Sequence, residues 1–335
     1  METTARPHCH ALVRFGATHP EALVLSADLT ASCEADGFRD AYPDRFFSFG
    51  LGEQNMMGFA AGLAREGFAP FVHTFGVFVT RRPFDQVAMS IAYPCLPVRL
   101  LGFLPGVTTP GGATHQAIDD LALMRALPNL TVLECGDATE VESLLEAMHA
   151  VPGPVYARVL RGEVPRLFPA AAPLVVGHAR VLGAGADVTL LSSGICTEEA
   201  LRAAAALRRR GVGVRHLHVA TLKPFDDPAV RDAVLAPGRG VITVENHSII
   251  GGLGSATAEL MAELGCGRPL VRLGLRDTFS HGASRATLLR EHGMDAAAVV
   301  GAVERLLGRA FEVAAAELAA VPLGPGAAAA AAEAL

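Results

Sequence analysis

The chain has 335 residues, of which 51% are hydrophobic and 19% are charged, and its formal charge is −6. The apolar fraction is too high for a disordered chain, and the length predicts about two or three domains with large cores. The mildly acidic balance argues against a basic surface for nucleic acid or for an anionic membrane. We expect a protein that binds neither.

The chain begins METTARPHCH, with no apolar stretch behind a basic start, so no ordinary secretory signal is predicted. No run of about 18 uncharged apolar residues follows, so no membrane span is expected. The six cysteines lie 24 to 70 residues apart and form no CxxC motif. We therefore expect reduced thiols and a cytoplasmic protein.

Between residues 20 and 160, short apolar runs alternate with segments whose apolar residues have helical spacing. The apolar runs predict strands at 22–25, 45–49, 70–74, 98–103, 131–134 and 155–158. The helical spacing predicts helices at 53–65, 83–92, 117–126 and 138–150. Such strict alternation predicts a parallel sheet with helices on both faces.

The stretch at 161–181 is rich in proline and alanine and predicts a crossover to a second unit. Beyond it, the pattern predicts strands at 187–192, 212–218, 240–245 and 270–273, and helices at 197–209, 255–264 and 295–307. We therefore predict two doubly wound α/β domains with mostly parallel sheets, at residues 8–165 and 181–310, joined by a linker at 166–180. The last segment, 311–335, ends in GPGAAAAAAEAL, and this low complexity predicts a disordered tail.

One acid, Glu53, lies at the start of an otherwise almost uncharged helical segment. A carboxylate in a first turn often does no more than interact with the helix dipole and the free N–H groups. The residues that follow are small and apolar, however, so Glu53 is also expected near a buried surface. Burial disfavours the ionised form and favours a carboxylic acid that donates a hydrogen bond.

Two phenylalanines, Phe75 and Phe78, follow a predicted strand at a spacing that can place both rings in one pocket. The alternative is that both are ordinary core aromatics. Arg81 and Arg82 come next, and we expect them either to bind an anionic substrate or to pair with Asp85.

A glycine-rich loop, GVTTPGGAT, leads to His115, which the pattern places at the start of a helix. Sheets of this class have their ligand crevices at the carboxyl ends of strands, so a histidine after such a loop is a candidate site residue. In the alternative interpretation, Thr114 caps the helix and His115 is an incidental exposed side chain.

Three weaker patterns predict no ligand site. The glycines at 251–254 precede a helix whose N–H groups can bind an anion, but we expect tight packing of strand and helix there instead. His216 and His218 share one strand face, and His8 and His10 lie near the terminus; neither pair has an evident third ligand. We predict no metal site in this chain.

Four segments together resemble the carboxyl-terminal half of transketolases: GLGEQNM, HTF-x-x-F, THQ-x-x-x-DLALMRA-x-PN and VITVENHSIIGGLGSA. They occur in the order and at the separations of that family, over residues 15–308. The resemblance implies a pyrimidine-binding domain for thiamine diphosphate, followed by a transketolase C-terminal domain. The greatest similarity is to the C-terminal sections of split bacterial transketolases, with 1-deoxyxylulose-5-phosphate synthase more distant.

The resemblance also implies residues that bind the cofactor. Glu53 matches the glutamate that hydrogen-bonds the aminopyrimidine ring of thiamine diphosphate, which makes it catalytic as well as cofactor-binding. Phe75 and Phe78 match the aromatic residues that line the pyrimidine pocket, with Phe78 as the stacking partner. Asp28 matches an aspartate of the same pocket.

Substrate contacts are implied in the same way. His115 matches the catalytic histidine that contacts the hydroxyl and carbonyl oxygens of the donor. Ser32 and Arg161 match residues that bind the substrate phosphate, for which a guanidinium offers two parallel hydrogen bonds. One position departs from the family: the usual DGPTHQ is GGATHQ here, with Gly111 in place of an aspartate that binds a substrate hydroxyl. The usual pentose-phosphate substrates are therefore in question.

Thiamine enzymes hold the diphosphate through Mg²⁺, with a GDG motif followed by two adjacent asparagines. This sequence has no GDG, and its three asparagines are not adjacent. The resemblance therefore implies a separate N-terminal subunit that carries this motif and holds Mg²⁺, in a heterotetramer of two plus two chains. The chain alone is expected to be inactive.

The expected activity is transfer of a two-carbon ketol unit from a ketose or ketose phosphate to an aldehyde. One alternative is half of another thiamine-dependent enzyme, such as a carboligase like 1-deoxyxylulose-5-phosphate synthase or a subunit like the beta chain of an oxo-acid dehydrogenase. The other is a structural subunit without catalysis.

Overall fold

Seven strands form the first sheet of the computed structural model, which describes residues 2–325. They are β2 (Ala22–Ser26), β3 (Phe46–Ser48), β4 (Ala69–Phe75), β5 (Arg99–Phe103), β6 (Thr131–Glu134), β7 (Val155–Val159) and β12 (Thr221–Lys223). Their order is β12-β6-β7-β5-β4-β2-β3, and only the pair of β12 with β6 is antiparallel. Every strand except β12 therefore ends at the same edge of the sheet.

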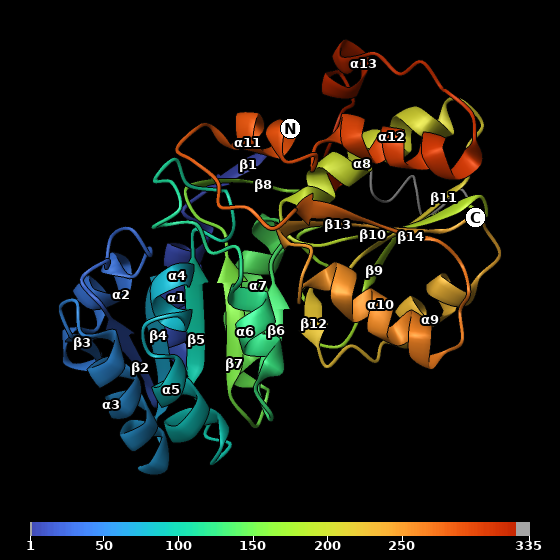
Figure 1. Ribbon diagram of the computed structural model, residues 1–335. Helices are drawn as coiled ribbons and strands as arrows, with labels where there is room; N and C mark the ends of the chain where they lie inside the picture. Colours follow the sequence, from blue (N-terminus) through green and yellow to red (C-terminus); the bar gives the residue numbers. More distant parts are fainter. Residues whose placement is uncertain (1, 326–335) are drawn as a thin grey trace.

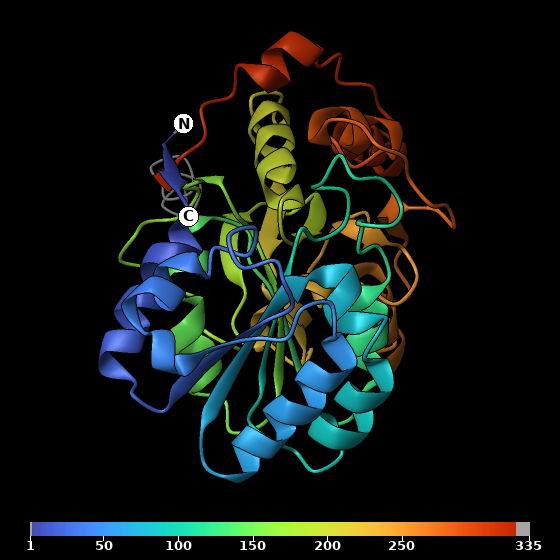
Figure 2. The same cartoon turned by 90° about the vertical axis from the view of Figure 1, so that its left-hand side faces the viewer.

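Helices cover both faces of this sheet, because successive strand residues point to opposite sides. Val24 and Phe71 pack on the side of α1 and α7, whereas Leu25 and Val72 pack on the side of α3 and α6; Figure 2 shows the two helical layers with the sheet between them. The helices are α1 (Pro7–Thr18), α2 (Asp36–Ala41), α3 (Glu53–Arg65), α4 (Gly76–Thr80), α5 (Phe84–Gln86), α6 (Asp120–Ala126) and α7 (Ala138–His149), with the 3₁₀ turn η1 (Pro43–Arg45) and the π-helix η2 (Val87–Ala92).

The second sheet belongs to the domain drawn in yellow to red in Figure 1, above and to the right of the first. Its strands are β9 (Arg180–Ala184), β10 (Val188–Ser192), β11 (Val214–His218), β13 (Val241–Ser248) and β14 (Leu270–Leu275). The order is β14-β13-β10-β11-β9, parallel except for β9 with β11. Its helices are α8 (Cys196–Arg208), α9 (Pro228–Leu235), α10 (Leu253–Glu263), α11 (Arg285–Glu291), α12 (Ala296–Leu307) and α13 (Ala315–Ala319).

Two features tie the domains together. Strand β12 comes from the second half of the chain and adds to the edge of the first sheet beside β6. The wholly buried guanidinium of Arg158 donates to Asp120, to Glu134 at 2.8 Å and, in the second domain, to the carbonyl of Asn246 at 3.0 Å. A buried charge is tolerated only when such partners surround it, so these contacts specify how the two halves meet.

The predicted fold class is confirmed, and several boundaries need correction. The helix predicted at 83–92 is divided into α5 and η2, and the one predicted from residue 117 begins at Asp120. A short antiparallel pair, β1 (Thr3–Ala5) with β8 (Glu163–Pro165), was not predicted. Within the described residues, no helix is long and apolar enough to cross a membrane.

Part of the segment predicted as a disordered tail forms helix α13. The guanidinium of Arg210 on the second domain binds both carboxylate oxygens of Glu317 at 2.6 Å, and Leu318 is buried. These contacts stabilise a helix that composition alone does not predict. Residues 326–335, the rest of the predicted tail, lie outside the described part of the chain.

Candidate cofactor and substrate site

The residues singled out from the sequence follow the carboxyl ends of neighbouring parallel strands. They are Asp28 and Ser32 after β2, Glu53 after β3, Phe75 and Phe78 at and after β4, His115 after β5 and Arg161 after β7. Parallel strands end at one edge, so residues that are distant in the chain come together there. This edge is the place where a sheet of this class binds ligands.

Three rings gather at this edge. The ring centroids of Phe75 and Phe78 lie 6.0 Å apart, and that of His115 lies 6.2 Å from Phe75 and 5.5 Å from Phe78, edge-on to both. The two phenylalanines and the histidine therefore form one aromatic cluster. His115 is in a turn and not at a helix start as predicted, because α6 begins only at Asp120.

Glu53 is the first residue of α3 and its side chain is 3% exposed. The Nη1 atom of Arg82 donates to Glu53 Oε1 at 2.7 Å, and the same guanidinium lies 4.1 Å from the centroid of the Phe78 ring. From the sequence, Glu53 is expected to be an acid that donates a hydrogen bond. In this arrangement the carboxyl accepts one instead, because a cation lies beside it.

The two adjacent arginines have different partners, and neither partner is Asp85. Arg81 binds Asp119 with its Nε atom 3.0 Å from both carboxylate oxygens and its Nη2 atom 2.7 Å from one of them. This contact joins the end of α4 to the start of α6, while Arg82 faces α3. Of the two alternatives left open by the sequence, the pair with Asp85 does not form, since the short helix α4 directs the two side chains to different neighbours.

The loop that carries His115 is held by its own neighbours and by the second domain. The Nε2 amide of Gln116 donates to the carbonyls of Thr109 at 3.2 Å and His281 at 3.1 Å. Thr114 Oγ1 lies 2.9 Å from His115 Nδ1, so it contacts the histidine and does not cap a helix. With Nδ1 engaged in this way, the Nε2 atom of His115 is the one left to contact a ligand.

A second group of residues lies around Arg161. Both carboxylate oxygens of Glu34 accept from backbone N–H groups, one from Cys9 at 3.3 Å and the other from Gly162 at 2.6 Å. Glu34 is two residues beyond Ser32 and Gly162 is next to Arg161, so this carboxylate joins the loops of the two predicted phosphate contacts. Arg161 itself is exposed and lines a cavity of about 330 Å³ between the domains, with Arg285 and Glu198 on its far side.

Asp28 is exposed and has a positive φ of 57°, a conformation that aspartate adopts more readily than most residues. Strained backbone of this kind is concentrated at ligand sites. The structure therefore places Asp28 at the same edge as the three rings, although no side-chain hydrogen bond ties it to another described residue.

The geometry permits a test of whether an aminopyrimidine ring fits beside Glu53. The guanidinium of Arg82 is planar, stacks on Phe78 and donates to the carboxyl. A flat heterocycle with a ring nitrogen next to Glu53 finds the same stacking surface and the same hydrogen-bonding group. The residues thus fit the pyrimidine half of thiamine diphosphate, once Arg82 moves from this position.

The patterns predicted to carry no ligand are explained by internal contacts. Glu245 accepts from the N–H groups of Leu253 and Gly254, so this chain's own carboxylate lies where the glycines at 251–254 could have bound an anion. His216 lies 2.8 Å from Ser192 Oγ. His218 bonds to Thr197 and to Glu140, whose Oε2 is 2.9 Å away, and His8 lies 3.0 Å from His73.

The roles of three residues at this edge were not predicted from the sequence. Arg82 was noticed but not connected with Glu53, and neither Gln116 nor Glu34 was considered as support for the loops. The sequence did contain one signal for the buried ionic network around Arg158, because Arg158 is a charged residue within the otherwise apolar strand VYARV. A charge in such a strand indicates a buried ionic partner.

Comparison with known families identifies both halves of the chain. Residues 6–166 match the transketolase pyrimidine-binding domain, and residues 177–299 match the transketolase C-terminal domain. This pair of domains defines the class, that of thiamine-dependent enzymes of transketolase type. The chain belongs to the transketolase family.

Individual relatives cover nearly the whole chain. It is 39% identical to a transketolase family protein of Sinorhizobium fredii over 308 residues. This alignment covers 91% of this chain and 89% of that protein. It is 39% identical over 299 residues to a 6-deoxy-6-sulfo-D-fructose transketolase subunit of a Clostridium species, 89% of this chain and 92% of the subunit. A solved structure described as a split gene transketolase, inactive beta4 tetramer, has a TM-score of 0.81 at 40% identity and covers 90% of this chain and 97% of its own.

Proposed function

We propose that this chain is the C-terminal subunit of a split, thiamine-diphosphate-dependent transketolase that transfers a two-carbon ketol unit from a ketose to an aldehyde. The observation that carries the proposal is the buried carboxyl of Glu53 beside the three rings of Phe75, Phe78 and His115. A buried acid needs a partner, and in this structure the partner is Arg82. A pyrimidine ring that stacks on Phe78 takes the place of Arg82 and gives the acid a catalytic purpose.

In this proposal, bound thiamine diphosphate supplies the nucleophilic carbon that accepts the two-carbon unit. Glu53 holds a proton at the pyrimidine nitrogen, and Phe78 fixes the plane of the ring. His115, with Nε2 free, contacts the oxygen atoms of the substrate. Arg161 and Ser32 bind the anionic end of the sugar, and Asp28 completes the cofactor pocket.

The Mg²⁺ and diphosphate half of the site is proposed to lie in a partner chain with the GDG and Asn-Asn motifs. The name of the solved relative supports a split site, since it describes a tetramer of one chain type as inactive. The Clostridium relative is likewise called a subunit. We propose a heterotetramer of two plus two chains.

The substrate is proposed to be a ketose with an anionic group at the end remote from the carbonyl. The exposed Arg161, with Arg285 across the cavity, suits a phosphate or a sulfonate equally. One relative is named for a sulfonated sugar, 6-deoxy-6-sulfo-D-fructose. Gly111, which lacks the carboxylate of the usual motif, supports a donor other than the common pentose phosphates.

The test is to co-express the chain with an N-terminal subunit encoded beside it and to assay ketol transfer with thiamine diphosphate and Mg²⁺. Fructose 6-phosphate, 6-deoxy-6-sulfofructose and pyruvate serve as alternative donors. Turnover of a ketose by the complex but not by the chain alone is expected. Full activity of the chain alone rules out the split site. If the complex turns over pyruvate and neither ketose, it is the carboligase or dehydrogenase of the alternative proposal. Cofactor binding without any turnover identifies a structural subunit.

A further inference from the structure

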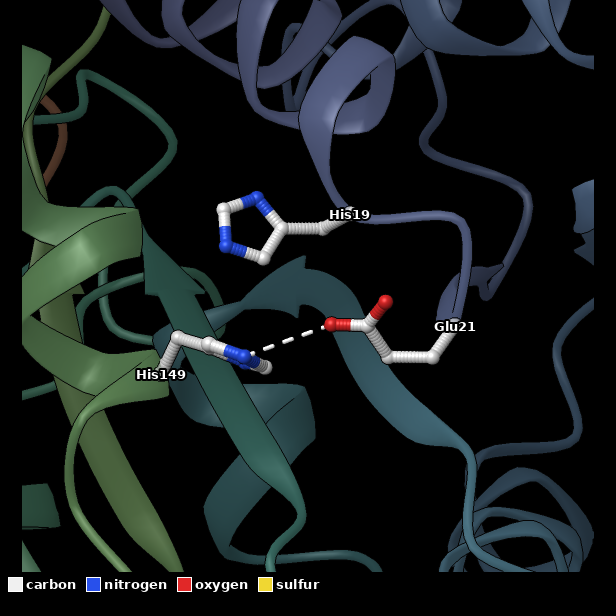
Figure 3. Close-up of side chains that lie close together, drawn as sticks. All are labelled: His19, Glu21 and His149. Carbon is white, nitrogen blue, oxygen red and sulfur yellow. Dashed lines mark ion pairs between the residues drawn. The ribbon is translucent and has the colours of Figure 1, made fainter.

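A cluster of possible metal ligands lies at the opposite edge of the first sheet, away from the proposed active site. His19 follows α1, Glu21 precedes β2 and His149 ends α7, so all three side chains are near the amino ends of the strands. Figure 3 shows the two imidazole rings and the carboxylate facing one another. Nothing in the proposed transketolase reaction uses them.

The spacing of their atoms suits a single small ion. One ligand atom from each of the three residues lies within 4.8 Å of the other two. The Nε2 atom of His149 is 3.3 Å from Glu21 Oε1. Two ligands of a tetrahedral zinc ion are also about 3.3 Å apart, given metal–ligand bonds of about 2.0 Å. A further carboxylate is close, because Glu146 Oε2 lies 3.7 Å from His19 Nε2.

The first histidine is held in the orientation that a ligand requires. His19 Nδ1 lies 3.1 Å from the carbonyl of Phe15, so the Nδ1–H group donates there and the lone pair is on Nε2. The ring also stacks on Phe15, with 3.9 Å between centroids. His149 packs edge-on to His19 at 4.7 Å. A metal-binding histidine usually has this kind of carbonyl partner behind it.

The charges around the cluster favour a cation. Glu21 and Glu146 bring two carboxylates to two imidazoles. Nitrogen and oxygen ligands of this kind are typical of Zn²⁺.

We propose that His19, Glu21 and His149 bind one divalent transition-metal ion of the Zn²⁺ type. Because the three ligands lie at the edge of the sheet opposite the proposed active site, the ion has a structural role. It joins the end of α1, the start of β2 and the end of α7, three segments that are far apart in the chain. Its binding therefore stabilises the folded first domain.

The test is equilibrium dialysis of the full-length chain against Zn²⁺ after treatment with a chelator. One ion per chain is expected, with a dissociation constant that rises at least tenfold in His19→Gln and in His149→Gln. His178→Gln is the matched control, since His178 is exposed and lies outside the cluster. Equal zinc binding by the wild type and by the His19→Gln/His149→Gln double variant overturns the proposal.

Two further readouts separate a site from a folding defect. Co²⁺ in place of Zn²⁺ is expected to give the intense visible bands of tetrahedral cobalt in the wild type and in His178→Gln, and not in the cluster variants. Zn²⁺ is expected to raise the melting temperature of the wild type only, with equal cooperative melting of all variants in chelator. If Zn²⁺ leaves the melting temperature of the wild type unchanged and no cobalt bands appear, the residues of the cluster form only ion pairs. Neither readout depends on the enzyme activity.

Discussion

The guanidinium of Arg82 donates to Oε1 of Glu53 at 2.7 Å, so the carboxyl proposed to bind the cofactor already has a partner. Arg82 also covers the Phe78 ring, at 4.1 Å from its centroid. The cofactor ring is proposed to use both surfaces. Arg82 and the cofactor therefore compete for one place, and Arg82, which is 49% exposed, is the group able to swing into solvent.

Arg82→Ala is expected to strengthen binding of thiamine diphosphate to the assembled enzyme. The half-exposed ion pair and the cation–π contact together contribute about 1 kcal/mol, which is about fivefold in affinity. Calorimetric titration of the complex measures the change. Arg81→Ala is the control, because Arg81 binds Asp119 instead. Weaker cofactor binding by Arg82→Ala shows that Arg82 holds the cofactor and does not compete with it.

Glu53→Gln is expected to lower kcat of the complex by about 100-fold or more, since the variant cannot exchange a proton with the pyrimidine nitrogen. Steady-state ketol transfer at saturating cofactor measures the loss. Glu66→Gln changes an exposed acid just beyond the same helix and is expected to leave kcat unchanged. Near-normal turnover of Glu53→Gln removes Glu53 from its proposed role.

Arg161→Ala is expected to raise KM for an anionic donor by about tenfold to 100-fold. This is the loss of affinity expected when one charged hydrogen-bonding group is removed. The side chain is exposed, so the free energy of unfolding is expected to change by no more than about 0.5 kcal/mol. An uncharged ketose serves as the internal control, because its KM does not depend on this arginine. An equal effect on both donors contradicts the assignment.

Gly111→Asp restores the carboxylate of the usual motif and is expected to change donor preference by about tenfold in kcat/KM. A Cβ atom at this position lies 3.0 Å from Cβ of His115, so the loop must yield by a few tenths of an ångström. Gly111→Ala is the matched control, since it adds the same Cβ without the carboxylate. The measurement is the ratio of kcat/KM for two ketoses that differ at one hydroxyl group. If both variants change this ratio equally, the effect is due to crowding by the added Cβ atom and not to the carboxylate.

The stability of the protein is expected to fall in mild acid because of its buried histidines. Burial lowers the pKa of His73 to about 4 from an ordinary 6.5, so between these values the unfolded chain binds a proton that the folded chain does not. The contribution of neutral His73 to the free energy of unfolding is fully present above pH 6.5 and is lost as the pH falls toward about 4. For His73 alone the loss at pH 5 is about 2 kcal/mol.

Urea unfolding at pH 7 and at pH 5 checks this expectation. His73→Gln keeps a polar side chain beside His8 without a titrating group, so its stability is expected to change less between the two values. His178→Gln, at an exposed position, is expected to retain the full change. An identical pH dependence for His73→Gln and the wild type contradicts the assignment.

Local pattern predicted much of this molecule correctly. The bounds of α3 and β6 agree with the ranges predicted from periodicity alone, because their apolar spacing is regular and unbroken. Strand β12 was missed since it is only three residues long and is stabilised by pairing with β6 in the other domain. Helix α4 was missed for a related reason: five residues are too few for a helical period to show.

The sequence alone determined the succession of strands and helices along the chain and the motifs of the transketolase family. Both depend on residues that are close together in the chain. The same local information placed Glu53, Phe75, Phe78 and His115 after parallel strands, so that their meeting at one edge followed from topology. Only the tertiary structure decided which arginine faces Glu53, since that depends on the direction in which the chain leaves α4, which packs against β5 and α6. It alone brought together His19 and His149, whose helices lie side by side although they are far apart in the sequence.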